Sequence, residues 1–468
     1  MKRYLAALLI TLCALNIYAQ DEQAAVDRFA AAKGMKHASA GVVIYDIEGD
    51  SVIASHLADQ AIVTASTMKT VTSVAALELL GGDFRFKTEV WLGGDIVGDT
   101  LCGNITIVGA GDPTLGSSHM TRQANIVDEI VNALKEKGVR VVEGKIVTDE
   151  SLYPFPPYSI HWDVGDLAWD YGAAVHPLNY ADNVMRVTFS VDKWGRFSTF
   201  HLKPDVPGVE VINKMTFSSV RDIDYALEYA HPAIIFSGPA SAGNYAFVTT
   251  NPTPAALLAD RVTAAAKRAG ISFTQQDTDH ERNKRQLLLT HLSPELTDII
   301  TSLLDRSDNM FTHALLRAIG VNSRQWNGGN PDPEAIKRVK KVLNSLRADS
   351  EALFMRDGSG LARAGKASPL MFAQMLAHVA QKEYNGKRMT DLMPRAGKRI
   401  GTLLPNTSLS KKISLKSGSM TDVQCFVGYY PADNPRYTFA ILANNYTCSR
   451  PELKNLMDRL LIDVFGKK

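Results

Sequence analysis

The sequence predicts a multidomain protein of mixed α/β (α+β) class, built on one five-stranded antiparallel sheet flanked by helices. Near the amino end, residues 41–47 and 51–54 flank a short Glu-Gly-Asp turn and indicate a β-hairpin. Near the carboxyl end, residues 413–420, 423–430 and 437–446 indicate three consecutive strands separated by turns. The first and last parts of the chain therefore share one sheet, and everything between them is an insertion.

Two helices are expected beside this sheet. One follows the hairpin at residues 67–80, where apolar residues recur at helical spacing and a Gly-Gly pair ends the pattern. The other closes the chain at residues 450–465 and has an apolar face. Ser449 and Glu452 stand at the positions of a capping box, which marks the start of this last helix.

The inserted part has its own helices and strands. Helical patterns occur at residues 122–137 and 255–270, and the clearest strands are at 184–191 and 245–249. Because a strand-rich section lies between the two helical patterns, the insertion is expected to divide in two.

Ser66 and Lys69 carry the first chemical signal. Three residues apart at a helix start, they face the same side, so the lysine can accept the proton of a serine that attacks a carbonyl. This requires burial and a nearby positive charge to lower the lysine pKa from about 10.4. The pattern is weak alone, because it also occurs at residues 190–193 and 408–411. A helix cap beside a solvated lysine would also explain it.

Two further motifs follow in order along the chain. Ser307 and Asn309 belong to a Ser-Asp-Asn triplet, which supplies a hydroxyl for proton relay and an amide that can bind a substrate amide. Lys416, Ser417 and Gly418 lie on an expected strand. Lys416 supplies a cation that can bind a substrate carboxylate and lower the pKa of Lys69. Ser417 supplies a hydroxyl, and Gly418 leaves room for a substrate backbone to approach closely. An ordinary polar turn or strand end explains each motif singly, but together they match the signature of penicillin-recognising serine enzymes.

The chain resembles the class C low-molecular-mass penicillin-binding proteins, which are the D-alanyl-D-alanine carboxypeptidase/endopeptidase group of peptidase family S13. The resemblance covers nearly all of the mature chain and rests on the three motifs and on the long stretch between Ser66 and Ser307. The chain departs from the family at Ser417, where Thr is more frequent, and at Ala362, where Ser is usual. Four more segments look like those of the group: residues 83–88, 109–115, 307–310 and 357–361.

The resemblance implies a serine D,D-peptidase with a β-lactamase/transpeptidase-like catalytic domain. Such an enzyme cleaves terminal D-Ala-D-Ala, or cross-links between D-Ala and a diamino acid, in peptidoglycan stem peptides through an acyl-serine, and penicillin acylates it. By resemblance, the backbone N–H groups of Ser66 and Ser419 would form the oxyanion hole. Asp166 would reach toward the diamino acid of the stem peptide, although a loop carboxylate in water explains this residue equally well.

The resemblance also implies a nested two-domain insertion. The expected segments are a signal peptide at 1–19, the transpeptidase-like domain at 21–86 and 281–468, a second domain at 87–159 and 246–280, and a strand-rich third domain at 160–245.

Composition excludes several classes of function. The net charge is +2 with its signs interspersed, so no basic face for nucleic acid is expected. The eleven histidines form no H-E-x-x-H or Cys/His cluster, and His161, Asp163 and Asp166 indicate a polar loop, so neither a metal nor a cofactor is expected.

A basic start followed by an apolar run at residues 4–17 indicates a signal peptide, and with the resemblance this suggests export to a bacterial periplasm.

Three cysteines remain after removal of residues 1–19. A hairpin centred between residues 433 and 434 places Cys425 opposite Leu442, so Cys448 lies about 20 Å further along the strand. We therefore expect Cys102, Cys425 and Cys448 to be free thiols rather than a disulfide between the last two.

Two alternative functions stay open at this stage. A β-lactamase or esterase would use the same serine and lysines, but the large insertion argues against it. A catalytically idle cell-wall binding protein would not need all three motifs. The expected partners are peptidoglycan peptides and β-lactams; peripheral association with the membrane or cell wall, and the oligomeric state, stay open.

Overall fold

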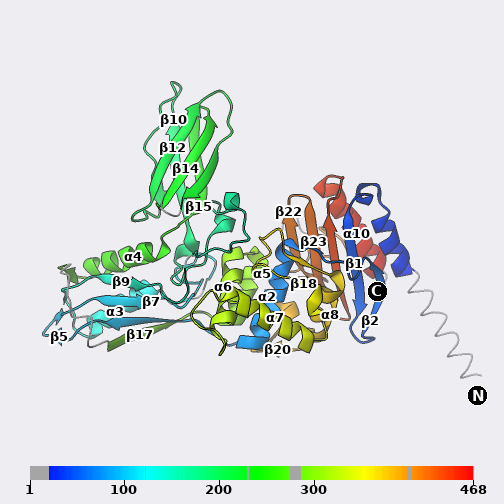
Figure 1. Ribbon diagram of the computed structural model, residues 1–468, viewed down its shortest axis with the longest axis horizontal. Helices are drawn as coiled ribbons and strands as arrows, with labels where there is room; N and C mark the ends of the chain where they lie inside the picture. Colours follow the sequence, from blue (N-terminus) through cyan, green and yellow to red (C-terminus); the bar gives the residue numbers. More distant parts are fainter. Residues whose placement is uncertain are drawn as a thin grey trace, which may run out of the picture. The chain divides into compact units, whose positions relative to one another are not determined.

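The chain forms two compact units (Figure 1). The computed structural model describes residues 21–121, 123–154, 156–228, 231–274, 286–397, 403–466 and 468. Of these described residues, those within 1–83, 300–308 and 332–468 belong to unit 1, and those within 84–299 and 309–331 belong to unit 2. Each unit is therefore assembled from segments that are far apart in the sequence.

Unit 1 is built on the five-stranded sheet that the sequence predicts. The strand order is β2-β1-β24-β23-β22, and every neighbouring pair is antiparallel. The strands are β1 (Ser39–Asp46), β2 (Ser51–His56), β22 (Ser414–Met420), β23 (Val423–Tyr430) and β24 (Tyr437–Asn444). Because β1 pairs with β24, the amino-terminal hairpin and the carboxyl-terminal strands share one sheet, and this prediction is confirmed.

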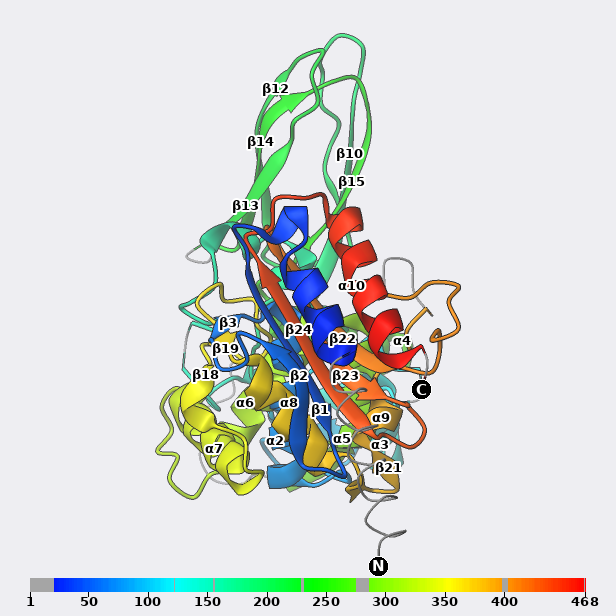
Figure 2. The ribbon, with the colours of Figure 1, turned by 90° about the vertical axis from the view of Figure 1, so that its right-hand side faces the viewer.

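Helices cover both faces of this sheet (Figure 2). α10 (Arg450–Phe465) shares a hydrophobic core with one face, and Ser449 and Glu452 form the predicted capping box at its start. α8 (Pro369–Val379) packs on the opposite face, against Val43 and Tyr45 of β1. Alternation of side chains along β1 explains how one strand contributes to two cores.

α2 (Met68–Leu80) follows a single 3-10 turn, η2 (Ala65–Thr67), and ends at Gly81, whose φ of 88° suits glycine. All of its first ten residues are buried, and α7 (Asp332–Ser345) packs beside it. A helix that is buried all round can hold a polar side chain away from water.

Unit 1 also contains several short elements: η1 (Lys33–Met35), β3 (Ile62–Val63), η7 (Ser350–Ala352), β18 (Leu353–Phe354), β19 (Lys366–Ala367), β20 (Glu383–Tyr384), β21 (Lys387–Arg388) and α9 (Met389–Leu392). The helix α5 (Leu296–Arg306) begins in the sequence of unit 2 and continues in that of unit 1.

Unit 2 contains two separate hydrophobic cores. The first joins α3 (Ile126–Glu136) and α4 (Pro254–Arg268) to two four-stranded sheets, ordered β17-β4-β7-β9 and β16-β8-β6-β5. α3 begins later than predicted because the Asn125 side chain caps it by accepting a hydrogen bond from Val127 N–H. The strands are β4 (Lys87–Leu92), β5 (Ile96–Val97), β6 (Thr100–Leu101), β7 (Ile105–Val108), β8 (Val141–Val142), β9 (Ile146–Asp149), β16 (Ser272–Phe273) and β17 (Gln286–Leu292).

The second core of unit 2 is rich in aromatic side chains and lies between two three-stranded sheets, ordered β11-β10-β15 and β12-β14-β13. The strands predicted at 184–191 and 245–249 correspond to β10 and to part of β15. The elements of this part are η3 (Val164–Asp166), η4 (Asp170–Gly172), η5 (Ala181–Asn183), β10 (Val184–Val191), β11 (His201–Lys203), β12 (Glu210–Phe217), β13 (Asp224–Glu228), β14 (Ala233–Ala240) and β15 (Gly243–Thr250). α6 (Asn309–Val321) belongs to unit 2 but contributes none of its described residues to this core.

The division of the chain into three domains stays a prediction. The border between the two compact units falls at 83/84 rather than at 86/87, and unit 2 includes the described residues 286–299 and 309–331. The signal peptide predicted at 1–19 lies outside the described residues. Within the described residues, no helix has both the length and the apolar character required to cross a membrane.

Candidate active site

Ser66 lies in the 3-10 turn that leads into α2. It follows Ala65, whose φ is 45°, and Thr67 separates it from the start of α2. Lys69 follows in the first turn of α2, and its Nζ lies 2.9 Å from Ser66 Oγ. The two side chains of the first motif therefore meet, as their spacing predicts.

Lys69 is completely buried. Its Nζ also donates a hydrogen bond to the Ser359 carbonyl oxygen at 2.8 Å. Burial lowers the pKa of Lys69 to about 7, while the carboxylates of Asp357 and Asp308 act in the opposite direction. The sequence interpretation gave the charge of Lys416 a share in this shift, but burial is its main cause.

Ser307 and Lys416 also meet within unit 1. Ser307 has a φ of 59° and joins α5 to the segment that begins α6. Lys416 is buried on β22, and its Nζ donates to Ser307 Oγ at 2.9 Å and to the Ser417 carbonyl oxygen at 2.7 Å. A hydroxyl held by an amine in this way can transfer a proton.

Gly418 brings β22 against the turn that carries Ser66. A Cβ atom at Gly418 would lie 2.9 Å from Ser66 N, 2.8 Å from Thr67 N and 2.7 Å from Thr64 O, so any side chain there would collide with backbone. On the same strand, Ser417 is half-buried and Ser419 is exposed. The pairing of the Ser66 and Ser419 N–H groups as an oxyanion hole stays a prediction.

Asn309 and Asp166 are connected through one tyrosine in unit 2. The Asn309 side chain donates from Nδ2 to the Tyr171 carbonyl oxygen at 2.8 Å. The Tyr171 hydroxyl donates to Asp166 Oδ1 at 3.0 Å. Sequence reasoning named the asparagine and the aspartate but missed the tyrosine that connects them, because nothing in the sequence relates Asn309 to Tyr171, which are 138 positions apart.

Sequence reasoning also missed the contribution of the loop at residues 357–362. The loop was recognised only as a family-like segment, yet its Ser359 carbonyl contacts Lys69 and its Gly358 carbonyl accepts a hydrogen bond from Thr72 Oγ1. The signal that could have found it is the repeated glycine after an aspartate, a pattern typical of a tight loop stabilised by a carboxylate.

Metal-ligating groups do not gather in the part of the chain that the structure describes, where no set of three or more His, Cys, Asp or Glu side chains could hold a metal ion. Cys102, Cys425 and Cys448 are free, and Cys425 pairs with Leu442 in register, as predicted.

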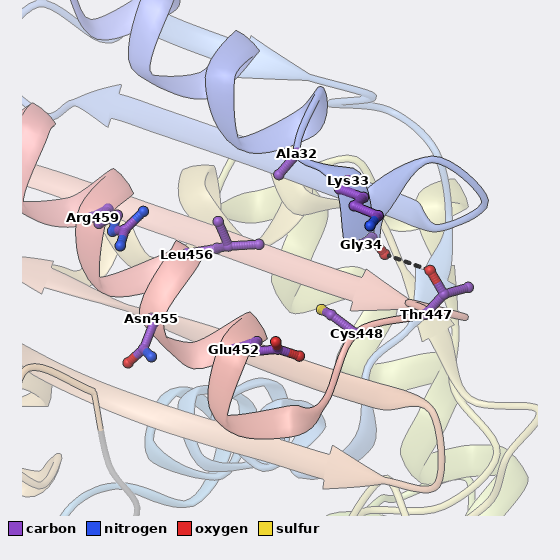
Figure 3. A pocket seen from close by; sticks show the side chains of 9 residues that line it. All are labelled: Ala32, Lys33, Gly34, Thr447, Cys448, Glu452, Asn455, Leu456 and Arg459. Carbon is purple, nitrogen blue, oxygen red and sulfur yellow. Dashed lines mark hydrogen bonds between the residues drawn. The ribbon is translucent and has the colours of Figure 1, made fainter.

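A pocket of about 510 Å³ lies beside α10 and is lined by Lys33, Cys448, Glu452 and Arg459, among others (Figure 3). Burial raises the pKa of the Cys448 thiol, which disfavours the reactive thiolate. None of the predicted site residues lines this pocket, so we do not consider it the active site.

Comparison with known proteins identifies one family. Residues 22–464 match the D-Ala-D-Ala carboxypeptidase 3 (S13) family. A D-alanyl-D-alanine carboxypeptidase of Actinomadura sp. is 24% identical over 442 residues, which is 89% of this chain and 80% of the relative. The D-alanyl-D-alanine carboxypeptidase DacB of Haemophilus influenzae is 23% identical over 437 residues, which is 88% of this chain and 87% of the relative.

The fold is also that of a solved structure. The crystal structure of penicillin binding protein 4 (dacB) from Haemophilus influenzae has a TM-score of 0.79 at 21% identity and covers 94% of this chain and 99% of its own. A second structure of that protein is complexed with a β-lactam; its TM-score is 0.75 at 21% identity, with the same coverage of both chains.

Proposed function

The chain belongs to the D-Ala-D-Ala carboxypeptidase 3 (S13) family of serine hydrolases, and we propose that Ser66 is its nucleophile and Lys69 its general base. The single observation that carries this proposal is the 2.9 Å contact between Lys69 Nζ and Ser66 Oγ in a buried setting that lowers the pKa of the amine to about 7. A buried amine near neutrality can accept the proton of the attacking hydroxyl at physiological pH.

The reaction follows from the contacts in unit 1. Ser66 Oγ attacks the carbonyl carbon of the penultimate D-alanine while its proton moves to Lys69 Nζ. When the carbon–nitrogen bond breaks, Ser307, held by Lys416, gives its proton to the leaving amine and takes one back from the lysines, so that the proton lost by Ser66 ends on the amine. Water then hydrolyses the acyl-serine and restores Ser66.

The substrates are peptidoglycan stem peptides. The terminal D-alanine has a free carboxylate, which Lys416 and the Ser417 hydroxyl on β22 are suited to bind through charge-assisted hydrogen bonds. In a cross-link between D-Ala and a diamino acid, a carboxylate stands in the same relation to the scissile bond, so one site serves carboxypeptidase and endopeptidase cleavage.

Asp166 is proposed to contact the diamino acid of the stem peptide. Support comes from its hydrogen bond with Tyr171, which in turn accepts a hydrogen bond from Asn309 of the second motif. If so, Asp166→Asn raises KM for a peptide whose diamino acid has a free amine and leaves penicillin acylation unchanged. Equal KM values for both proteins would contradict this role.

The test of the main proposal is labelling with a fluorescent penicillin, followed by mapping of the labelled peptide. We expect the label on Ser66 and none on Ser66→Ala, whose melting temperature should stay close to that of the wild type. Ser190→Ala is a matched control, since Ser190 begins another S-x-x-K pattern but lies on β10. Labelling of Ser66→Ala would contradict the assignment. Fast release of the penicillin would favour a β-lactamase instead.

Export to the periplasm is proposed on the basic and apolar pattern at residues 1–17. The measurement is the mass of the mature protein from a bacterial envelope fraction, which should lack about the first 19 residues. An intact amino terminus in the cytoplasmic fraction would contradict export.

A further inference from the structure

The carboxylate of Asp357 organises the loop at residues 357–362 from within. Asp357 is 1% exposed, and its Oδ1 accepts from Gly360 N–H at 2.7 Å. Its Oδ2 accepts from the Ser359 hydroxyl at 3.0 Å, from Leu361 N–H at 3.1 Å and from Ala362 N–H at 3.2 Å. A buried carboxylate with this many donors fixes the backbone that surrounds it.

The loop at residues 357–362 also packs against α2 and against η2, the turn that contains Ser66. Thr72 Oγ1 of α2 donates to the Gly358 carbonyl oxygen at 2.6 Å. Gly360 has a φ of 76°, and a Cβ there would lie 1.9 Å from the Ala65 carbonyl oxygen. The loop therefore touches α2 and the residue before Ser66, with no room for adjustment at Gly360.

The contact between this loop and Lys69 matters for the chemistry. A neutral amine has two N–H bonds and one lone pair, and only the lone pair can accept the Ser66 proton. The Ser359 carbonyl oxygen, 2.8 Å from Lys69 Nζ, accepts one N–H bond and so limits the directions in which the lone pair can point. Displacing this carbonyl would turn the amine away from the nucleophile.

We propose that Asp357 is a positioning residue for the general base, because its carboxylate holds the Ser359 carbonyl where it orients the Lys69 amine toward Ser66. This proposal rests on the proposed function and deepens it. An asparagine cannot replace the carboxylate, because both carboxylate oxygens accept hydrogen bonds. In asparagine one of these oxygens is replaced by an NH₂ group, which would place a donor against backbone N–H donors.

The test compares Asp357→Asn with the wild type in peptide hydrolysis and penicillin acylation from pH 5 to 9. We expect kcat and the acylation rate to fall about 100-fold, as for a small displacement of a catalytic group, with KM unchanged. Two carboxylates, those of Asp357 and Asp308, raise the pKa of Lys69. Asp357→Asn removes one of these carboxylates and so lowers the pKa of Lys69. The midpoint of the rise in activity with pH therefore moves from about 7 to a lower pH.

The midpoint follows the lost charge whatever the role of Asp357, so the split between kcat and KM decides: a purely structural role would lower kcat and raise KM together. A folded Asp357→Asn protein with wild-type kcat, or with reduced kcat and raised KM, overturns the proposal. Should Asp357→Asn fail to fold, Ser359→Ala decides, because it keeps the carbonyl and removes one hydrogen bond to Asp357. We expect about fivefold slower acylation; an unchanged rate overturns the proposal.

Asp349→Asn is the matched control. Asp349 is exposed, and its carboxylate accepts a hydrogen bond from Glu351 N–H in another loop of unit 1. We expect wild-type kcat and midpoint for this variant. Labelling of wild-type Ser66 separates the two proposals. An unlabelled wild type contradicts the proposed function and this inference, whereas a labelled wild type with an unaffected Asp357 variant contradicts only the inference.

Discussion

At the scale of single residues, Lys69, the proposed general base, is expected to determine the pH at which the enzyme can react. Its amine is completely buried, and burial lowers its pKa from 10.5 to about 7. Below that pH the amine holds its proton and cannot accept another from Ser66. The acylation rate is therefore expected to rise as pH increases through about 7. Above about pH 8, where nearly all of the Lys69 amine is neutral, the rate should no longer change with pH.

Replacing Lys69 with arginine tests this dependence. Lys69→Arg keeps the positive charge but cannot lose its proton in this pH range, so acylation should fall by about 10²–10⁴-fold. The measurement is the rate constant of penicillin acylation between pH 5 and 9. The wild type should show the rise near pH 7 and the variant should not. Near-normal acylation of Lys69→Arg at neutral pH would mean that the base is another group.

The sequence alone supported only part of this site. The spacing of Ser66 and Lys69 on a helix predicts their contact, since residues three apart share a face. It does not predict that the helix is buried on every side, because that depends on α7 and on the loop at 357–362. The main cause of the low lysine pKa is thus a property of tertiary packing.

At the scale of secondary-structure elements, β22 must lie very close to the Ser66 turn. Gly418 permits this, and Gly418→Ala would force a methyl group to within 3 Å of three backbone atoms. We expect acylation to fall about 100-fold as the strand and the turn separate. Gly329→Ala, where the nearest atom is a side-chain oxygen at 3.4 Å, is the control and should acylate normally. Equal acylation rates for the two variants would show that close approach is not required.

The same strand is proposed to orient the substrate carboxylate. Ser417→Ala should lower cleavage of a D-Ala-D-Ala-terminated pentapeptide and of a cross-linked muropeptide dimer by comparable factors, about 10-fold or more, as for a lost hydrogen bond to a charged group. Ser417→Thr keeps the hydroxyl and should be tolerated. Turnover of both substrates by the three proteins is the measurement. If Ser417→Ala leaves both unchanged, β22 does not orient the substrate in this way.

Elements were predicted best where the local pattern determines pairing. The three carboxyl-terminal strands are joined by short turns, so their register follows from the sequence, and Cys425 does pair with Leu442. Asn309 is a contrasting case, because its side chain contacts Tyr171, which lies in a distant part of the chain. Such contacts between distant segments leave no periodic signal in one sequence.

At the scale of the whole molecule, unit 1 brings together both ends of the described chain. β1 and β2 come from its beginning, while β22, β23, β24 and α10 come from its end. The hydrophobic core between α10 and the sheet contains residues from both ends. Assembly of the Ser66 site on this sheet is therefore expected to depend on the closing helix.

Two neighbouring positions of α10 separate this effect from any change in the catalytic groups. Leu461 is fully buried in the core, whereas Ile462 is 38% exposed. Leu461→Asp places an unpaired carboxylate among apolar side chains, which is strongly destabilising, so the melting temperature and penicillin labelling of Ser66 should both fall. Ile462→Asp adds the same charge on the surface and should change neither. Thermal unfolding and labelling at 25 °C are the measurements. If Leu461→Asp melts and labels like the wild type, the closing helix is not required to assemble the site.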